Sequence, residues 1–261
     1  MVLDFFKYEG AGNDFILVDD RGLDFPTADR DLIKHLCDRR FGIGADGLML
    51  IQPLRNFDFN MVYYNADGNE STMCGNGGRC IAAFAGMLGI IRDKARFMAA
   101  DGEHLAELVS PEYVRLNMRD VLSVETGPDF YYLNTGSPHY VTFLPSIQAL
   151  DVFSEGRAVR NSERFRESGT NVNFVEDHGD HIFVRTYERG VENETLACGT
   201  GVVAAAISSA IRRKHDKISL SIPVKVPGGS LNVSFTMQPG KFTDIWLEGP
   251  ATFVFNGKIT I

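Results

Sequence analysis

Met73-Cys74-Gly75-Asn76-Gly77-Gly78-Arg79-Cys80 and Ala197-Cys198-Gly199-Thr200-Gly201-Val202-Val203 are the two stretches that decide the fold. Each opens with a Cys-Gly-(Asn/Thr)-Gly pattern and continues into small and apolar residues that predict a helix. The offset between the cysteines, 198 − 74 = 124 positions, is close to half of the 261-residue chain. The repeat therefore predicts two similar halves, each with a cysteine at the start of a helix, and we expect the two cysteines to face each other across a cleft.

A cysteine at a helix start occupies a favourable place for a thiolate. The N–H groups of the first helical turn lack intrahelical partners, and the helix dipole adds partial positive charge there. A thiol with a pKa of about 8.5 is only ~3% ionised at pH 7, and half ionisation requires a shift of roughly 1.5 units, or ~2 kcal/mol. A stabilisation of ~2 kcal/mol is the most that a helix terminus typically gives to a charged group. We therefore expect other groups to assist Cys74 and Cys198.

Two such thiols could exchange the proton of one carbon. One thiolate would remove the proton, and a thiol on the opposite face would return one. This is the chemistry of a racemase or epimerase that needs no cofactor. A single cysteine at a helix start is more commonly a small buried residue. However, neither packing nor a disulfide requires the repeated glycines, which let a ligand approach backbone N–H groups closely.

Composition narrows the class of protein. Hydrophobic residues make up 44% and charged residues 23% of the chain, as in ordinary globular proteins. The net charge is −8 without a basic stripe, which argues against a nucleic-acid partner. No apolar run approaches the ~18 residues of a membrane span, and the start shows no secretory signal. The four cysteines are too few for a dense disulfide framework. We expect a cytoplasmic protein with reduced thiols and no membrane partner.

Apolar alternation and turn residues predict strands on both sides of each cysteine-headed helix. In the first half these are residues 2–8, 14–19, 48–51 and 57–64, then helix 75–88, then strands 94–100, 103–109 and 113–118. A helix at 29–40, capped by Thr27 or a neighbour, interrupts them. In the second half they are residues 131–134, 140–143, 171–176 and 181–187, then helix 198–214, then strands 217–222, 230–235 and 242–247. Residues 151–166 are helical or irregular, and a last strand pair at 251–261 could return to the first half.

This order predicts an α/β fold of the α+β type. Each pseudo-symmetric half would wrap a curved mixed or antiparallel sheet around one central helix. The expected domains are residues 1–118 plus 251–261, carrying Cys74, and residues 119–250, carrying Cys198.

Three other features have simpler interpretations. Gly42 to Gly47 contains a formal G-x-G-x-x-G, but a dinucleotide site needs a strand before it and a helix after it. Here that order is reversed, so we interpret the segment as a helix-to-strand turn. Cys37 lies inside a predicted helix and Cys80 in the second turn of another, so both are expected to pack in the core.

Several motifs together resemble the diaminopimelate epimerase family over nearly the whole chain. They are Gly10-Ala11-Gly12-Asn13-Asp14-Phe15, Arg40-Phe41-Gly42-Ile43-Gly44-Ala45-Asp46-Gly47, Asn65-Ala66-Asp67-Gly68, the two cysteine stretches, Gly136-Ser137-Pro138-His139, Thr170-Asn171-Val172 and Tyr187-Glu188-Arg189-Gly190. Each motif alone is weak, but their common order is specific.

The resemblance implies an enzyme that interconverts LL- and meso-diaminopimelate, for lysine and peptidoglycan precursors, without pyridoxal phosphate or metal. It implies two α/β halves and a homodimer. By position, Cys74 and Cys198 are the acid/base thiols. Gly75, Asn76, Gly199 and Thr200 hold the α-carboxylate. The residues that bind the rest of the substrate are Asn13, Asn65, Asn171, Glu188 and Arg189. Those that adjust the pKa of the thiols are His139 and Glu188.

The substrate's distal amino-acid end would suit amides, a carboxylate and a guanidinium. Glu188-Arg189 could instead be a surface ion pair, Asn13 a turn residue, and His139 a loop-ordering residue. Ser137 and Gly47 depart from the pattern of many relatives, so no ligand contact is assigned to them. The loop 191–195 before Cys198 is also slightly longer than in the family.

Three alternatives stay open. A proline or hydroxyproline racemase would use the same two thiols, but a small imino acid would not need Asn65, Asn171 and Arg189 for a second charged end. A redox or metal-binding protein would use Cys74, Cys80 and Cys198, although Cys74-x5-Cys80 lacks ligand spacing. The third alternative is a non-catalytic amino-acid-binding protein of the same fold.

Overall fold

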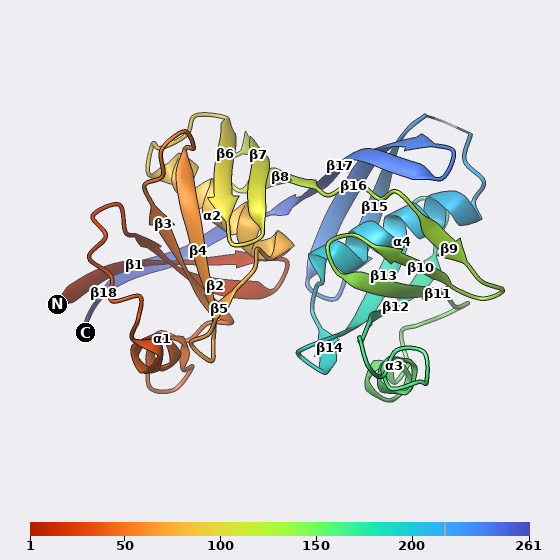
Figure 1. Ribbon diagram of the computed structural model, residues 1–261, viewed down its shortest axis with the longest axis horizontal. Helices are drawn as coiled ribbons and strands as arrows, with labels where there is room; N and C mark the ends of the chain where they lie inside the picture. Colours follow the sequence, from red (N-terminus) through yellow and green to blue (C-terminus); the bar gives the residue numbers. More distant parts are fainter. Residues whose placement is uncertain (217) are drawn as a thin grey trace. The chain divides into compact units, whose positions relative to one another are not determined.

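The chain folds into two compact units in a computed structural model that describes residues 1–216 and 218–261. The first unit comprises Met1–Leu116 and Gly249–Ile261, and the second comprises Asn117–Glu248. In Figure 1 the first unit runs from red to yellow and the second from green to blue, with the chain's end returning to the first. Each unit combines a mixed sheet with a helix that the strands surround, which confirms the expected fold class.

The first unit's sheet alternates antiparallel and parallel pairs. β1 pairs antiparallel with β2, β2 parallel with β3, β3 antiparallel with β4, β4 parallel with β6, and β6, β7 and β8 follow as an antiparallel meander. The strands are β1 (Val2–Gly10), β2 (Asn13–Asp19), β3 (Gly47–Gln52), β4 (Phe59–Asn65), β5 (Glu70–Ser71), β6 (Lys94–Ala99), β7 (Gly102–Ser110), β8 (Tyr113–Met118) and β18 (Thr252–Thr260).

The second unit repeats this order. β10 pairs antiparallel with β11, β11 parallel with β12, β12 antiparallel with β13, β13 parallel with β15, and β15, β16 and β17 form the meander. Its strands are β9 (Val124–Thr126), β10 (Tyr131–Asn134), β11 (Pro138–Phe143), β12 (Asn171–Asp177), β13 (Ile182–Glu188), β14 (Asn193–Thr195), β15 (Ser219–Val226), β16 (Gly229–Gln238) and β17 (Lys241–Pro250). The predicted internal repeat is thus a repeat of topology.

The central helices are α2 (Gly75–Met87) and α4 (Gly199–Arg212). Every residue from Gly75 to Ala85 is buried, and α2 contacts β1, β2, β3 and β7. Helix α4 contacts β10, β11, β12, β13, β15 and β16, and its buried residues also cover all its faces. A helix that is apolar all round must be enclosed by the protein. The Ala, Gly and Val content of both segments therefore explains their place inside the sheets.

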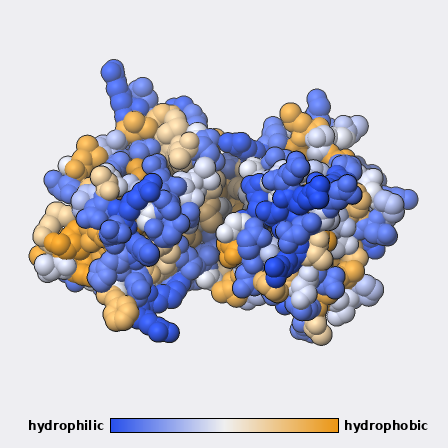
Figure 2. Space-filling view, turned by 60° about the horizontal axis from the view of Figure 1, so that its bottom comes forward, coloured by the Kyte–Doolittle hydropathy of each residue, from blue (hydrophilic) through white to orange (hydrophobic). Residues whose placement is uncertain are grey.

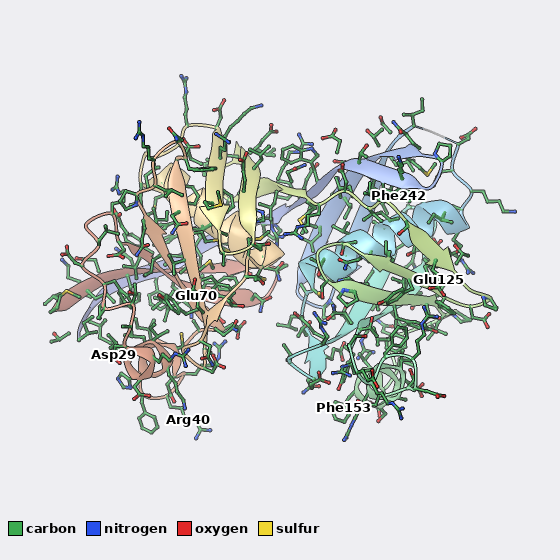
Figure 3. All side chains as sticks on the ribbon, viewed as in Figure 1. Asp29, Arg40, Glu70, Glu125, Phe153 and Phe242 are labelled. Carbon is green, nitrogen blue, oxygen red and sulfur yellow. The ribbon has the colours of Figure 1, made fainter. Side chains whose placement is uncertain are left out.

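The predicted helix 29–40 is shorter than expected. Helix α1 covers Arg30–Cys37 and is capped by Asp29, a near neighbour of Thr27, whose Oδ1 accepts a hydrogen bond from Leu32 N (3.0 Å). Asp38 ends the helix because its Oδ1 accepts the N–H groups of Arg40 (2.7 Å) and Phe41 (2.8 Å), which forms a turn. Figure 3 labels Asp29 and Arg40 beside this helix. Helix α3 (Val152–Arg160), with Phe153 labelled, is the regular part of the segment 151–166.

The predicted strand pair at 251–261 was also wrong. These residues form one long strand, β18, which pairs antiparallel with β1 and so returns to the first unit as expected. The G-x-G-x-x-G segment lies between α1 and β3, as a helix-to-strand turn. Of the predicted strand 217–222, Lys217 lies outside the described residues, and β15 begins at Ser219. Sequence patterns missed the short strands β5, β9 and β14.

Hydrophilic residues dominate the face shown in Figure 2, and hydrophobic residues are scattered over both units. Among the described residues, no helix has both the length and the apolar character that crossing a membrane would require.

Candidate active site

Cys74 is the residue that caps the start of helix α2. Its backbone is extended (φ −102°, ψ 135°), its carbonyl accepts the N–H of Gly78 (2.7 Å), and its side chain is half-buried. The helix therefore begins at Gly75, one residue after the thiol, as the sequence predicted. Free N–H groups and partial positive charge at a helix start favour an anion there.

Asn13 and Asn76 join the turn after β1 to the start of α2. Asn76 Nδ2 donates to Asn13 Oδ1 (2.6 Å), and Asn13 Nδ2 donates to Asp46 Oδ2 (2.8 Å). Asn76 is fully buried, whereas Asn13 is half-buried. Asn65 lies at the end of β4, where its carbonyl accepts the N–H of Gly68 (2.9 Å). The structure thus connects Asn13 with Asn76 directly and places Asn65 at a strand end, half-buried.

A cluster of charged side chains adjoins Asn13, with Lys7 on β1, Asp14 on β2, and Arg39 and Asp46 between α1 and β3. Lys7 Nζ lies 2.7 Å from Asp14, and Arg39 Nη2 lies 2.5 Å from Asp14 and 2.7 Å from Asp46. Burial raises the pKa of Asp14, but hydrogen bonds from Arg39 and Lys7 outweigh it and lower this pKa to about 2. The ion pair with Arg39 holds the Asp46 carboxylate in place, and Asp46 in turn orients the Asn13 amide, which donates to it.

Arg79 is a fully buried cation one turn into α2. Its guanidinium donates to Gly75 O (3.1 Å), Asn76 Oδ1 (3.0 Å) and Pro250 O (3.3 Å), all of them neutral acceptors. Burial lowers its pKa, and the neighbouring Cys80 and Cys74 oppose that shift. Arginine nevertheless keeps its charge in proteins. A fixed positive charge therefore lies inside the helix that Cys74 begins.

Cys198 caps α4 in the same way, with an extended backbone (φ −116°, ψ 107°), and its side chain is 6% exposed. Its Sγ lies 3.5 Å from Thr200 Oγ1. Thr200 Oγ1 in turn lies 2.9 Å from His139 Nε2, and Thr135 Oγ1 donates to Thr200 O (2.8 Å). The structure therefore links three of the predicted site residues in one chain of contacts.

His139 is fully buried in β11. Burial, followed by the positive charge of Arg189, lowers its pKa from 6.5 to about 3. The imidazole is consequently neutral near pH 7. It can donate or accept hydrogen bonds near Cys198, but it does not supply a positive charge.

Asn171, Arg189 and Ser137 form a second polar group in this unit. Asn171 Nδ2 donates to Ser137 Oγ (2.9 Å) and Pro138 O (3.0 Å), and Asn171 Oδ1 accepts the backbone N–H of Arg189 (2.9 Å). The exposed Arg189 side chain donates to Ser168 O (3.0 Å) and reaches Ser137 Oγ (3.4 Å). Ser137, to which the sequence assigned no contact, therefore bridges two predicted site residues.

Glu188 ends β13 beside the loop that precedes Cys198. Thr195 Oγ1 donates to Glu188 Oε2 (2.9 Å). Burial raises the pKa of this carboxyl, and the Thr195 hydrogen bond partly offsets the rise. A carboxyl with a raised pKa keeps its proton at a higher pH than an ordinary glutamate does.

The sequence model of one family, described as diaminopimelate epimerase, matches residues 5–121 and 131–254. A diaminopimelate epimerase from Flavobacterium psychrophilum is 49% identical over 255 residues, which cover 97% of this chain and 99% of that protein. The chain belongs to the diaminopimelate epimerase family. Another member, from Chlorobaculum tepidum, is 43% identical and covers 97% of this chain and 99% of its own length. Membership makes the chain an isomerase.

Solved structures outside this family share the fold. A PhzF-family phenazine biosynthesis protein from Bacillus anthracis has a TM-score of 0.76 at 14% identity and covers 100% of both chains. A probable proline racemase from Agrobacterium radiobacter has a TM-score of 0.69 at 16% identity, with 99% of this chain and 93% of that chain covered. At such identities the likeness extends to the fold alone.

The two remaining cysteines, Cys37 and Cys80, differ from the helix-start pair in position. Cys37 and Cys80 are buried, and burial raises the pKa of both thiols, that of Cys37 to about 12. All four cysteines are free thiols, and the described residues contain no group of three or more His, Cys, Asp or Glu side chains that could hold a metal.

Sequence reasoning missed several polar residues that contact the candidate site residues, namely Arg79, Asn173, Ser137 and Thr195. Arg79 was visible as a cation among small residues in a helix that is otherwise apolar. Asn173 was visible as a polar residue flanked by apolar residues within a buried strand. The residue 124 positions earlier, at the equivalent place in the first half, is the apolar Met49. Ser137 and Thr195 lie in turns whose contacts depend on tertiary structure.

Proposed function

We propose that this chain interconverts LL- and meso-diaminopimelate by paired proton transfer between Cys74 and Cys198. The observation that carries the proposal is the position of each thiol as the cap of an enclosed helix, in two units of equal topology. Family membership supports the substrate and a role in lysine and peptidoglycan precursor synthesis. We further propose that the two units are the two domains of the enzyme, close to the expected halves 1–118 plus 251–261 and 119–250.

In the proposed step, the thiolate of one cysteine forms an S–H bond with the α-proton while the C–H bond breaks. The electron pair remains on the α-carbon and its carboxylate. The thiol of the other cysteine gives its proton to the opposite face of that carbon and becomes the new thiolate. Atoms and charges balance without a cofactor or metal, so we propose that neither takes part.

The helix starts supply the remaining stabilisation. Backbone N–H groups of Gly75, Asn76, Gly199 and Thr200 are proposed to hold the α-carboxylate, because first-turn N–H groups have no acceptor within the helix and the helix start carries partial positive charge. The buried charge of Arg79 supports an anion at the α2 start. Negative charge that develops on the carboxylate during proton removal would be favoured there.

The distal end of diaminopimelate carries an ammonium and a carboxylate. We propose that Asn13, Asn65, Asn171, Glu188 and Arg189 bind the substrate's charged groups. Arg189 is exposed and its backbone N–H is held by Asn171, which supports a role in binding a carboxylate. Its guanidinium also reaches Ser137, which we add to the proposed binding group.

Two residues are proposed to tune the thiols. The raised pKa of Glu188 supports a proton-holding role in the Cys198 unit. His139 is neutral near pH 7, so its proposed influence is through hydrogen bonds rather than charge.

We propose a homodimer formed through β18. Its residues Phe253, Val254 and Phe255 are 38%, 52% and 44% exposed in consecutive positions, and the strand pairs on one side with β1. A second copy of the chain would cover these apolar side chains. A cytoplasmic location is proposed because four free thiols suit a reducing compartment.

The test compares substrates. The purified chain is incubated with stereochemically pure LL-diaminopimelate and, separately, with L-proline in D2O. We expect deuterium and the meso isomer from diaminopimelate and no exchange in proline. Deuterium entering proline but not diaminopimelate would overturn the proposed substrate.

The two thiols are tested by substitution. Cys74→Ala and Cys198→Ala should each abolish epimerisation while retaining diaminopimelate binding, and full activity in either variant would refute the proposed roles.

A further inference from the structure

Asn173 has a fully buried side chain on β12, and its Oδ1 faces Gly201 in the first turn of α4. Figure 1 shows β12 beside α4. Its Nδ2 donates to the carbonyl oxygen of Tyr140 (3.0 Å) and lies 3.1 Å from His139 Nδ1. Its Oδ1 accepts from Thr186 Oγ1 (3.0 Å). All the polar atoms of this side chain therefore have partners, in one fixed orientation.

The hydrogen bond with the Tyr140 carbonyl oxygen determines the orientation of the Asn173 side-chain amide. A carbonyl oxygen can only accept, so the atom that faces it must be the NH2 group of Asn173. The second hydrogen of that group then points to His139 Nδ1, which must accept it. Because a neutral imidazole carries one proton, that proton lies on Nε2.

The Nε2–H group of His139 faces Thr200 Oγ1 at 2.9 Å and donates to it. Thr200 Oγ1 keeps its own hydrogen, and Cys198 Sγ lies 3.5 Å away. When Cys198 is a thiolate it can only accept, so the Thr200 hydroxyl donates to it. Each donor in the series from Asn173 to Cys198 thus determines the direction of the next hydrogen bond.

The first unit shows that the fold does not require this series. At an offset of 124, Met49 occupies the place of Asn173 and Phe15 that of His139. A Cβ added at Gly77 would lie 3.0 Å from Met49 Cε and 3.6 Å from Phe15 Cζ. The equivalent Cβ at Gly201 would overlap Asn173 Oδ1. The same backbone site is therefore apolar behind α2 and polar behind α4.

We propose that Asn173 is a positioning residue, which holds neutral His139 in the Nε2–H tautomer so that the Thr200 hydroxyl donates to the Cys198 thiolate. The proposal rests on the proposed function of Cys198. Charged groups near the series are the guanidinium of Arg189, which disfavours imidazolium, and the carboxyl of Glu188 at the end of the adjoining strand β13. The series is specific to the second unit, so the two thiols would differ in their hydrogen-bonded environment.

The tautomer is directly measurable. Long-range 1H–15N spectra of the uniformly 15N-labelled full chain distinguish Nε2–H, Nδ1–H and protonated imidazoles, and the His139→Gln spectrum assigns the His139 signals. We expect the Nε2–H form throughout pH 5 to 8. An Nδ1–H or protonated His139 in the wild-type chain at pH 7 would overturn the proposal, whether or not any variant folds. This result is independent of the diaminopimelate assay, so either proposal can fail without the other.

Alkylation kinetics test the effect on sulfur. Iodoacetamide labelling is followed by mass spectrometry of the tryptic peptide Gly190–Arg212, which contains Cys198 alone, and of Asn56–Arg79, which contains Cys74 alone. In Asn173→Leu, a volume-matched change, we expect Cys198 to react about tenfold more slowly at pH 7, since one lost hydrogen bond to a thiolate corresponds to roughly one pKa unit. The difference should vanish at high pH, and the Cys74 rate should not change.

The matched control is Asn232→Leu, on β16 of the same unit, where Asn232 bonds Ser221 Oγ (3.0 Å). It should leave both rates and the His139 tautomer unchanged. A Cys198 rate in Asn173→Leu equal to that of the wild type, with the Nε2–H tautomer intact, would also overturn the proposal.

Discussion

Arg79 Nη2 donates to Asn76 Oδ1 over 3.0 Å, and this contact ties a fully buried guanidinium to the start of the helix that Cys74 begins. Asn76 continues the contact to Asn13, and Asn13 to Asp46, so a series of hydrogen bonds runs from the core of the first unit to its surface charges. The Arg79 guanidinium donates to neutral carbonyl oxygens and not to a carboxylate. Its positive charge is therefore not neutralised, and it adds to the positive potential at the helix start.

Arg79→Met should strongly destabilise the chain, because it removes the guanidinium that donates to Gly75 O, Asn76 Oδ1 and Pro250 O. Buried acceptors that lose a charged donor typically cost about 1–3 kcal/mol each, with partial relaxation. We expect a loss of about 2–4 kcal/mol in the free energy of unfolding, measured by urea titration. The control is Arg55→Met at an exposed position, which should change stability by less than about 0.5 kcal/mol. An equal effect of both substitutions would contradict the structural role of Arg79.

Gly77→Ala and Gly201→Ala form a matched pair at the two helix starts. The new methyl of Gly77→Ala would meet the flexible end of Met49 at 3.0 Å, which can move aside. The methyl of Gly201→Ala would overlap Asn173 Oδ1, which is held by Thr186. Since alanine gains about 1 kcal/mol of helix propensity over glycine, Gly77→Ala should be nearly neutral. Gly201→Ala should lose about 1–3 kcal/mol and change the His139 tautomer, as read by urea unfolding and 15N spectra. A more damaging Gly77→Ala would contradict this account.

The four thiols should react with alkylating agents in two classes. Burial raises the pKa of Cys37 to about 12 and that of Cys80 further, so both are neutral thiols at pH 8. Because the thiolate is the nucleophile, we expect these two to be labelled only after unfolding. Cys74, which is half-buried, should react before Cys198, and diaminopimelate should protect both. Timed labelling with peptide mass spectrometry measures this order, and early labelling of Cys37 accompanied by full inactivation would count against the assignment.

His139 should make stability depend on pH below neutrality. Its pKa is lowered to about 3 in the folded chain by burial and by Arg189, against 6.5 in the unfolded chain. As pH falls from 6.5 towards 3, the unfolded state binds a proton that the folded state cannot, so the free energy of unfolding decreases by up to about 1.4 kcal/mol per pH unit. In His139→Gln this contribution is absent, and the curve between pH 6 and 4 should be flatter by that amount. Parallel curves from urea titrations would disprove it, and exposed His35→Gln serves as control.

Much of the fold followed from local pattern. The repeated Cys-Gly-x-Gly stretches predicted both central helices because small apolar residues on all faces require enclosure. The strand pairs around them followed from alternation. The end of α1 did not follow, because the Asp38 carboxylate competes with the helix for backbone N–H groups. The length of β18 was missed because Phe253, Val254 and Phe255 break the alternation that would mark a single strand.

The candidate site was predictable where a motif is local, and less so where partners are distant in sequence. Cys74 and Cys198 follow from the helix-start pattern alone. The contact of His139 with Thr200 joins residues 61 positions apart, and that of Arg79 with Pro250 joins residues 171 apart. Such contacts arise from strand pairing and chain return. The offset of 124 locates Asn173 opposite Met49, but only the structure shows which groups it orients.

In the proposed mechanism, Cys74 and Cys198 serve one carbon from opposite faces. The most direct measurement starts from LL-diaminopimelate in D2O and examines both isomers by mass spectrometry at low conversion. We expect the meso product to carry one deuterium at the inverted carbon and the recovered LL substrate to remain unlabelled, because each thiol serves one face. Deuterium appearing equally in the recovered substrate would indicate a single base and would contradict the account.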